Sequence, residues 1–458
     1  MNLLSRKLQT NIPPLPEKVL QFGTGILLRG LPDFFIDKAN KQGIFNGKIV
    51  VIKSTAGSAE DFQAQDGLFT TCVRGLQNGQ IVEENTVNEA ISRVISAKDN
   101  WGAILKIAQS KEIEVIISNT TEVGIQYVAE SIFATSPSSF PAKLTAILYE
   151  RFKTLPQVGF IIIPTELIPD NGSKLKEVIL QLIDFNQLGN DFKTWVLEEN
   201  IFCNSLVDRI VTNATPETKA SLPYQDSLAI QTEPYRLWAI EGGEKVKEIL
   251  SFHQADSGVI IAENIDYYRE RKLRLLNGTH TISVCKGFLK GLNTVYECMQ
   301  DAEMQAFIKS VMLDEIMPTV LAQKYPISVS EEELNQYAHE ILDRFRNPNI
   351  VHYLINITLQ ATMKMKMRNL PTILRYKKLF GENPSLMIQG FDAYALFMKI
   401  AKEEDGKFFG KRQGEYYLIQ DDAAKHFAEK WGTKDLQNEQ EIATYLREVQ
   451  GEILFSVS

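Results

Sequence analysis

A chain of 458 residues is too long for one ordinary hydrophobic core, so we expect two domains. Its 44% hydrophobic and 23% charged residues are typical of a soluble globular protein. The net charge of −8 argues against nucleic acid as a partner, and an anionic substrate would need a locally basic pocket.

Scattered cysteines and histidines indicate neither disulfides nor a metal site. The four cysteines form no Cys-x-x-Cys pair, and we expect reduced core thiols. The five histidines form no His-x-x-x-His pair, so no dedicated metal site is expected. Residues 1–18 lack the apolar region of a signal peptide, and no apolar run approaches membrane-spanning length. We therefore expect a cytoplasmic protein without a membrane partner.

The first strand leads directly into a glycine pair. Lys18–Phe22 is predicted to be a short buried strand, followed by Gly23-Thr-Gly25 and an apolar-periodic helix through Ile36. Strand, Gly-x-Gly and helix is the context in which a backbone approaches a dinucleotide pyrophosphate, although a lone Gly-x-Gly is also a common tight turn. Leu28 replaces the third glycine of the usual pattern. The candidate cofactor contacts in this run are Phe22, Gly23, Thr24, Gly25, Ile26, Leu27, Leu28, Arg29 and Gly30.

Two further strands end in polar residues. Lys48–Lys53 is predicted to be a strand that ends in Lys53 and Ser54, with no acidic residue to accept from a ribose 2′-hydroxyl. Lys53 would suit the 2′-phosphate of NADP, or it simply caps a strand end. A strand over 113–118 is followed by Asn119, Thr120 and Glu122, which either meet the nicotinamide end of a dinucleotide or form a turn without a ligand.

The remaining pattern predicts the fold class. Further strands are expected over 157–163 and 258–262, the latter as the last strand of the sheet, with a hairpin insertion near 68–83. From residue 269 onward helical periodicity dominates. We expect an α/β protein, with a Rossmann-type doubly wound sheet in residues 1–262 and a mostly α-helical domain in 263–458. The predicted helices of that domain cover 302–312, 331–345, 351–367, 371–379, 385–402, 421–430 and 439–448.

The stretch Tyr267–His280 is rich in side chains that can take part in acid–base chemistry. It carries four cations, an amide and an imidazole between leucines, and its spacing predicts a helix that starts near Arg269. At about 100° per residue, Lys272, Asn277 and His280 share one broad sector, which lines a pocket if the turn loosens at Asn277. A half-buried lysine among cations loses its proton more easily, as a general acid or base requires. The alternative is a solvated basic helix start.

Two basic segments stand out in the helical half. One contains Arg344 and Asn347, and the other contains Lys364, Lys366 and Arg368 between methionines. Cations here are either a solvated helix end or the site that binds a substrate carboxylate, for which the planar fork of arginine is best suited.

Lys272, Asn277 and His280, at their spacing, resemble the signature of the polyol-specific long-chain dehydrogenases, the mannitol dehydrogenase family. The resemblance runs from Val19 to the C-terminal helices and includes the form Gly-x-Gly-x-x-x-Arg. It implies that the lysine is the general acid/base, that the asparagine holds the alkoxide and that the histidine contacts a substrate hydroxyl. It also implies NAD as cofactor, against the indication of Lys53, and a substrate in the cleft between the domains.

Within the family, 21–30, 118–124 and 164–167 resemble the hexuronate-reducing branch. The reaction this implies is reversible hydride transfer between NADH and a ketohexuronate, which gives an aldonate. Leu167 stands where mannitol dehydrogenases have a second alkoxide-holding asparagine, so Asn277 acts alone or another donor substitutes. Asp208 matches a family aspartate that faces the substrate, or it caps a surface helix. The substrate-binding candidates are Asp208, Arg344, Asn347, Lys364 and Arg368.

Two alternatives to this function remain. The nearer is another branch of the family, which reduces fructuronate or oxidises mannitol or mannitol phosphate. The farther is a nucleotide-bound sensor without catalysis, against which the intact set Lys272, Asn277 and His280 argues.

Overall fold

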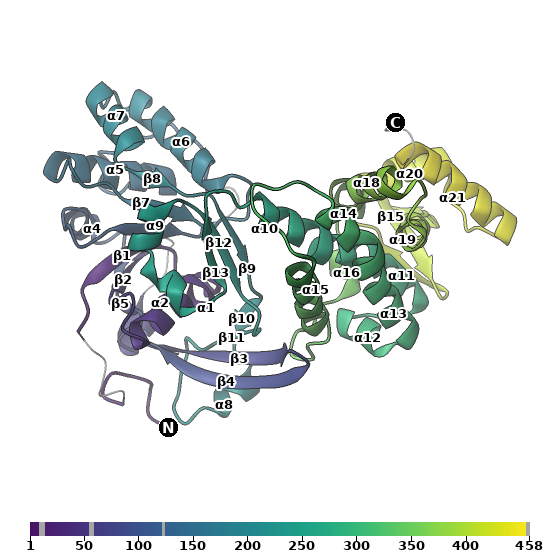
Figure 1. Cartoon of the computed structure of the whole chain (residues 1–458), viewed down its shortest axis with the longest axis horizontal. Helices are drawn as coiled ribbons and strands as arrows, with labels where there is room; N and C mark the ends of the chain where they lie inside the picture. Colours follow the sequence, from purple (N-terminus) through teal and green to yellow (C-terminus); the bar gives the residue numbers. More distant parts are fainter. Residues whose placement is uncertain (9–13, 55–58, 121–123, 455–458) are drawn as a thin grey trace. The chain divides into compact units, whose positions relative to one another are not determined.

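The computed structural model describes residues 1–8, 14–54, 59–120 and 124–454 (Figure 1). The chain forms two compact units, of which the first comprises 1–74 and 81–265 and the second comprises 75–80 and 266–458. Among the residues that the structure describes, no helix is both long enough and apolar enough to cross a membrane.

A six-stranded sheet forms the centre of the first unit. Its order is β5-β2-β1-β6-β7-β8, and every neighbouring pair is parallel. The strand order reverses between β1 and β6, which is the switch point where open α/β sheets bind ligands beyond the carboxyl ends of their strands. This confirms the predicted Rossmann-type sheet. In sheet order the strands are β5 (Ile91–Ser96), β2 (Lys48–Lys53), β1 (Glu17–Phe22), β6 (Val115–Ser118), β7 (Ile161–Pro164) and β8 (Ile201–Phe202).

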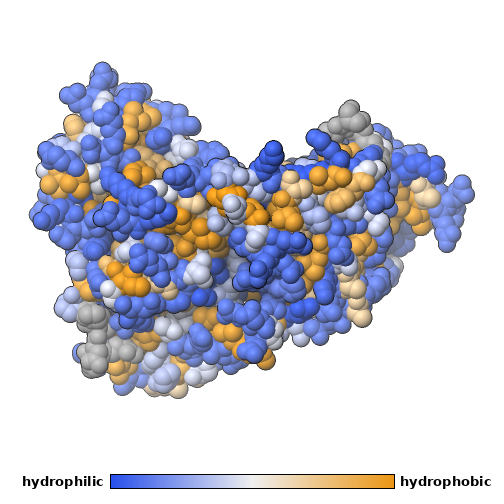
Figure 2. Space-filling view, viewed as in Figure 1, coloured by the Kyte–Doolittle hydropathy of each residue, from blue (hydrophilic) through white to orange (hydrophobic). Residues whose placement is uncertain are grey.

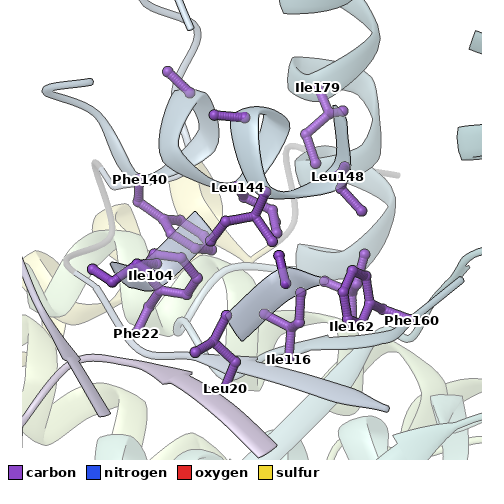
Figure 3. Packing of buried hydrophobic residues seen from close by; sticks show 14 of the residues in the cluster. Leu20, Phe22, Ile104, Ile116, Phe140, Leu144, Leu148, Phe160, Ile162 and Ile179 are labelled. Carbon is purple, nitrogen blue, oxygen red and sulfur yellow. The ribbon is translucent and has the colours of Figure 1, made fainter. Parts of the chain in front are cut away.

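Both faces of this sheet are buried, as the apolar runs of its strands require. Because side chains alternate along a strand, Leu20 and Phe22 point to one face while Val19 points to the other. Figure 3 shows the first face, where Leu20, Phe22 and Ile116 pack under Phe140, Leu144 and Leu148. Hydrophilic side chains, by contrast, cover most of the face drawn in Figure 2. The helices of the first face are α4 (Trp101–Ala108), α5 (Phe140–Thr154), α6 (Asn171–Phe185) and α7 (Asn190–Glu198).

The helix after β1 is divided at Leu31. Helix α1 (Ile26–Gly30) ends there and α2 (Pro32–Lys41) begins, because Pro32 cannot supply the N–H that a continuous helix needs. Gly30 lies against a smaller sheet of this unit, which contains Val211 and Thr232. A Cβ added at Gly30 would lie 2.6 Å from the side chain of Val211 and 3.2 Å from that of Thr232. The close packing that the third glycine of the usual pattern provides is therefore supplied by Gly30.

We expect Gly30→Ala to destabilise the first unit. Its methyl group would overlap the side chain of Val211, and overpacking of this kind costs about 1–3 kcal/mol. The shift of the urea midpoint measures this loss. The matched control is Gly25→Ala, because a Cβ at Gly25 meets nothing within 4 Å. Equal losses in the two variants would show that contact with Val211 is not the cause.

Two smaller sheets lie in the first unit, except that the tip of one hairpin, 75–80, belongs to the second unit. The hairpin predicted near 68–83 is formed by β3 (Phe69–Gln77) and β4 (Gln80–Asn88). Asn78 and Gly79 connect the two strands with positive φ angles, as a type I′ turn requires. The strand expected at 258–262 is β13 (Val259–Ala262), but it belongs to a separate sheet, β13-β12-β9, and not to the main one. The other strands are β9 (Ser205–Asp208), β10 (Val211–Asn213), β11 (Ile230–Thr232) and β12 (Leu237–Glu241).

The second unit is mostly helical, as predicted (Figure 1). Helix α15 (Glu331–Phe345) matches its predicted bounds, and Ser330 caps it by accepting from the N–H of Glu333 at 3.1 Å. Besides α15, the α-helices are α10 (Asp266–Arg271), α11 (Thr279–Lys290), α12 (Val295–Gln300), α13 (Ala302–Ser310), α14 (Met317–Leu321), α16 (Leu354–Ile357), α17 (Ala361–Lys364), α18 (Leu370–Phe380), α19 (Ser385–Phe397), α20 (Ala424–Trp431) and α21 (Glu439–Ile453), and the π-helices are η2 (Lys272–Gly278), η3 (Val311–Ile316) and η4 (Met365–Asn369).

Two predicted helices of this unit are wrong in extent. The helix expected over 351–367 is broken, because Gln360 has a φ of 52° and separates α16 from α17. The helix expected over 385–402 ends at Phe397, and a small antiparallel sheet follows that we did not expect. Helical periodicity missed this sheet because its three strands are only three to six residues long. They are β14 (Lys402–Glu404), β15 (Lys407–Arg412) and β16 (Glu415–Leu418).

Candidate active site

The glycine pair sits at the carboxyl end of β1, beside the switch point. Gly23 has a φ of +120° and donates to the carbonyl oxygen of Ile52 at 3.1 Å. A Cβ at Gly23 would lie 3.0 Å from the carbonyl oxygen of Asn119, so only glycine fits this turn. Gly25 precedes α1, and the space where its Cβ would point is open. The backbone is therefore accessible at the position where a pyrophosphate would approach.

The side chain of Arg29 points into the protein. Arg29 is buried, and its guanidinium donates to the carbonyl oxygen of Leu228 and faces the rings of Phe62 and Phe69. Burial lowers the pKa of this guanidinium, and the carboxylate of Asp33 acts in the opposite direction. Arg29 thus links α1 to the segment before β11, a role that the sequence did not indicate.

A buried carboxylate joins the loops after β6 and β7. Glu166 accepts from Ser118 Oγ at 3.1 Å and from both the N–H and the hydroxyl of Thr120 at 2.9 Å. Asn119 Nδ2 donates to the carbonyl oxygen of Thr165 at 3.0 Å. Asn119 and Thr120 are therefore held in place at the edge of the sheet where Lys53 ends β2. The predicted contact Glu122 lies outside the described residues, and the predicted Ser54 follows Lys53.

Leu167 and Asp208 also belong to the first unit. Leu167 is 63% exposed and cannot supply the hydrogen bond that an asparagine would offer. Asp208 is the last residue of strand β9 and is buried, so the surface helix cap considered from the sequence is wrong. The next residue, Arg209, donates to the carbonyl oxygens of Gly30 and Glu233, which fixes this strand end.

The stretch with Lys272 is a π-helix. Helix α10 ends at Arg271, the π-helix η2 spans Lys272–Gly278, and α11 continues with His280 in its first turn. The predicted helix therefore exists, but its assumed 100° spacing is wrong here. In a π-helix the hydrogen bonds join residues i and i+5, so Asn277 lies one wide turn beyond Lys272 and closer to its face. The loosened turn that a pocket requires is thus present. Such π segments are rare in proteins, and those that occur are often found at functional sites.

A second π-helix holds η2 in place. The π-helix η4 (Met365–Asn369) receives two hydrogen bonds of 2.8 Å from Arg274, at the carbonyl oxygens of Met367 and Arg368. Arg274 is also paired with Glu270 at 2.9 Å. From η4, Asn369 Nδ2 donates to the carbonyl oxygen of Gly278 at 2.9 Å. These three hydrogen bonds join the two π-helices.

The predicted cations of the second unit gather near His280. Arg368 donates to Thr281 Oγ1 at 3.1 Å, next to His280 in the chain. The ring of His280 lies 4.1 Å from that of Phe345 and 5.2 Å from that of His352, measured between centroids. Burial lowers the pKa of both His352 and Lys364; the charges of Arg344 and Lys364 lower that of His352 further, and the charge of Arg368 lowers that of Lys364. We call the three cations Arg344, Lys364 and Arg368, together with the titratable His352, the cationic cluster.

The second unit thus brings together most of the residues predicted to perform chemistry. Lys272, Asn277 and His280 lie on η2 and the start of α11, and η4 with Arg368 is bonded to both segments. Asn347 is buried near Arg344, and its Oδ1 accepts from the N–H of Asn349 at 3.0 Å. Sequence reasoning missed Arg274 and His352. Arg274 carried no spacing signal, and His352 fell within 351–367, a stretch predicted to be one continuous helix.

The comparisons with known proteins cover both units. Residues 17–252 match the model of the mannitol dehydrogenase Rossmann domain, and residues 264–454 match that of the mannitol dehydrogenase C-terminal domain. An altronate oxidoreductase of Halalkalibacterium halodurans is 39% identical over 420 residues, which are 89% of this chain and 80% of the relative. That of Bacillus subtilis is 38% identical over 406 residues, which are 87% of this chain and 83% of the relative.

Solved structures with low identity share the fold. The structure of Pseudomonas fluorescens mannitol 2-dehydrogenase in a ternary complex with NAD and D-mannitol matches with a TM-score of 0.66 at 22% identity. The match covers 99% of this chain and 92% of that chain. A substrate-free D-sorbitol dehydrogenase has a TM-score of 0.77 at 18% identity, with 98% of each chain covered. Since both family models match over almost the full length and curated relatives exceed a third in identity, the chain belongs to the mannitol dehydrogenase family.

Proposed function

We propose that this chain is an NAD-dependent altronate oxidoreductase, also called tagaturonate reductase. It reversibly interconverts a ketohexuronate and the corresponding aldonate. The observation that supports the substrate class best is the cationic cluster beside His280. A net charge of −8 repels anions at long range, so four cationic or titratable side chains gathered at one place indicate a local attraction for an acid. The relatives named altronate oxidoreductase support the same substrate.

NAD fits the residues of the first unit. Gly23, Gly25 and the start of α1 would hold the pyrophosphate, and Lys53, Ser54, Asn119 and Thr120 border the same edge of the sheet. The open space beyond Gly25 is where a side chain would otherwise block this approach. When bound, the cofactor supplies or accepts the hydride. A reaction of this kind is expected in the cytoplasm.

The second unit supplies the proton chemistry. In reduction, the keto carbon gains a hydride, its oxygen gains a proton from the ammonium group of Lys272, and the resulting neutral amine is reprotonated from solvent. The amide of Asn277 donates a hydrogen bond to the forming alkoxide. His280 orients a neighbouring hydroxyl, and the rings of Phe345 and His352 limit how its imidazole can turn. The cationic cluster binds the carboxylate, for which charge-assisted hydrogen bonds are well suited.

The decisive experiment measures NADH oxidation with tagaturonate and fructuronate side by side. We expect a higher kcat/KM for tagaturonate. Preference for fructuronate would instead assign the chain to the other hexuronate branch. Repeating the assay with NADPH tests the cofactor, because Lys53 ends β2 where a 2′-phosphate would find a positive charge. We expect NADH to be preferred, and a clear preference for NADPH would show that Lys53 selects the phosphate.

A further inference from the structure

His352 is a second histidine in the candidate site. Its ring lies 5.2 Å from the ring of His280, at an interplanar angle of 64°. Its backbone is fixed, since its carbonyl oxygen accepts from the N–H of Val295 at 3.0 Å and the next residue, Tyr353, forms a bridge with Thr294. The imidazole is therefore held next to a residue proposed to contact substrate.

Charged and titratable groups approach His352 from several elements. His280 faces it from α11, Arg344 acts on it from α15 and Lys364 acts on it from α17, while α12 contributes the backbone N–H of Val295. Burial lowers the pKa of His352, and the positive charges of Arg344 and Lys364 lower it further. Burial lowers the pKa of Lys364 as well, the charge of Arg368 lowers it further, and the carboxylate of Asp421 raises it. Both effects on His352 favour the neutral form of its ring in the free protein.

We propose that His352 is a positioning residue that takes up a proton when the carboxylate of the substrate binds to Arg344 and Lys364. The inference rests on the proposed function and extends it. A bound carboxylate would compensate the two positive charges that disfavour the imidazolium. Once protonated, the ring would be a third cation beside the anion, and it would carry two N–H donors instead of one beside His280. Binding of an acid would then be coupled to protonation, whereas binding of an uncharged ketose would not.

The direction of the pH dependence follows from this linkage. The pKa of His352 should be higher in the complex with the acid than in the free protein. At a pH between these two values, the complex holds up to one more proton than the free protein. Affinity for the acid must therefore rise as the pH falls through this range, by up to about tenfold per pH unit, and become constant outside it. A residue that merely maintains the fold would not produce such a profile.

The test is titration calorimetry of altronate binding to the protein saturated with NADH, a pair that cannot react. Measured in two buffers of different ionisation enthalpy between about pH 6 and 8, wild type should take up a substantial fraction of one proton. His352→Gln should take up almost none, and its affinity should be nearly independent of pH. His339→Gln is the matched control, because His339 is an exposed histidine on α15 and should leave the uptake unchanged.

The outcomes separate this inference from the function on which it rests. If wild type oxidises and binds altronate but proton uptake persists in His352→Gln, the inference is overturned and the function stands. If wild type neither oxidises nor binds altronate, the proposed function fails first. Should His352→Gln not fold, the pH dependence of inhibition by altronate in wild type decides alone, and a flat profile between pH 6 and 8 would refute the coupling.

Discussion

Lys272→Ala should reduce turnover by a factor of about 10² to 10⁴, the usual loss when a positioned general acid is removed. The half-buried lysine opens the π-helix η2, and Asn277 lies one wide π turn beyond it. Without the ammonium group, the alkoxide must take its proton from water. Affinity for NADH should remain nearly unchanged, because the glycine turn belongs to the first unit. Steady-state kinetics and a fluorescence titration of NADH measure the two quantities separately.

A matched lysine tests whether charge alone matters. Lys290 ends α11, the helix that continues η2, and pairs with Asp301 at 2.6 Å and Glu303 at 2.8 Å on the surface. Lys290→Ala should keep full activity. Retention of more than about a third of wild-type activity by Lys272→Ala near neutral pH would show that another group is the acid, since the expected loss is roughly a hundredfold or more.

Removal of a cation from the cluster should separate acids from neutral sugars. A hydrogen bond to a charged group contributes roughly 1.5–3 kcal/mol, so alanine at Arg344, Lys364 or Arg368 should lower kcat/KM for tagaturonate by about 10- to 150-fold. The largest loss is expected at an arginine, whose fork matches a carboxylate with two hydrogen bonds. Activity on fructose, where it is measurable, should hardly change. Both sugars must therefore be assayed on each variant.

Neighbouring cations provide the controls. Lys366 follows Lys364 by two residues but has an exposed side chain, and Arg346 lies 4.0 Å from Asp343 at the end of α15. Lys366→Ala and Arg346→Ala should affect neither sugar. Equal losses on tagaturonate and fructose in a cluster variant would mean that its cation positions hydroxyls or maintains the fold. If the wild type reduces fructose better than it reduces the acid, the hexuronate assignment is refuted.

The sequence by itself determined the parallel sheet at the centre of the first unit and the positions in the chain of the proposed chemical groups. Apolar runs such as 48–53 and 113–118 can be buried on both faces only in a parallel sheet, and a glycine pair after the first strand marks the switch point. Capping is also local, which is why the bounds of α15 agree with the prediction. These signals depend on residues close together in the chain, so one sequence is enough to detect them.

Only the tertiary structure decided how the candidate active site is held. The π geometry of η2 coexists with hydrogen bonds from Arg274 and Asn369 that connect it with η4, about ninety residues away in the chain. Likewise, His352 enters the site because its ring lies beside His280, although the pattern around it predicted one continuous helix. Periodicity reports the average burial of a segment. It does not report which distant groups bond to an irregular turn, such as the one that carries the proposed catalytic residues.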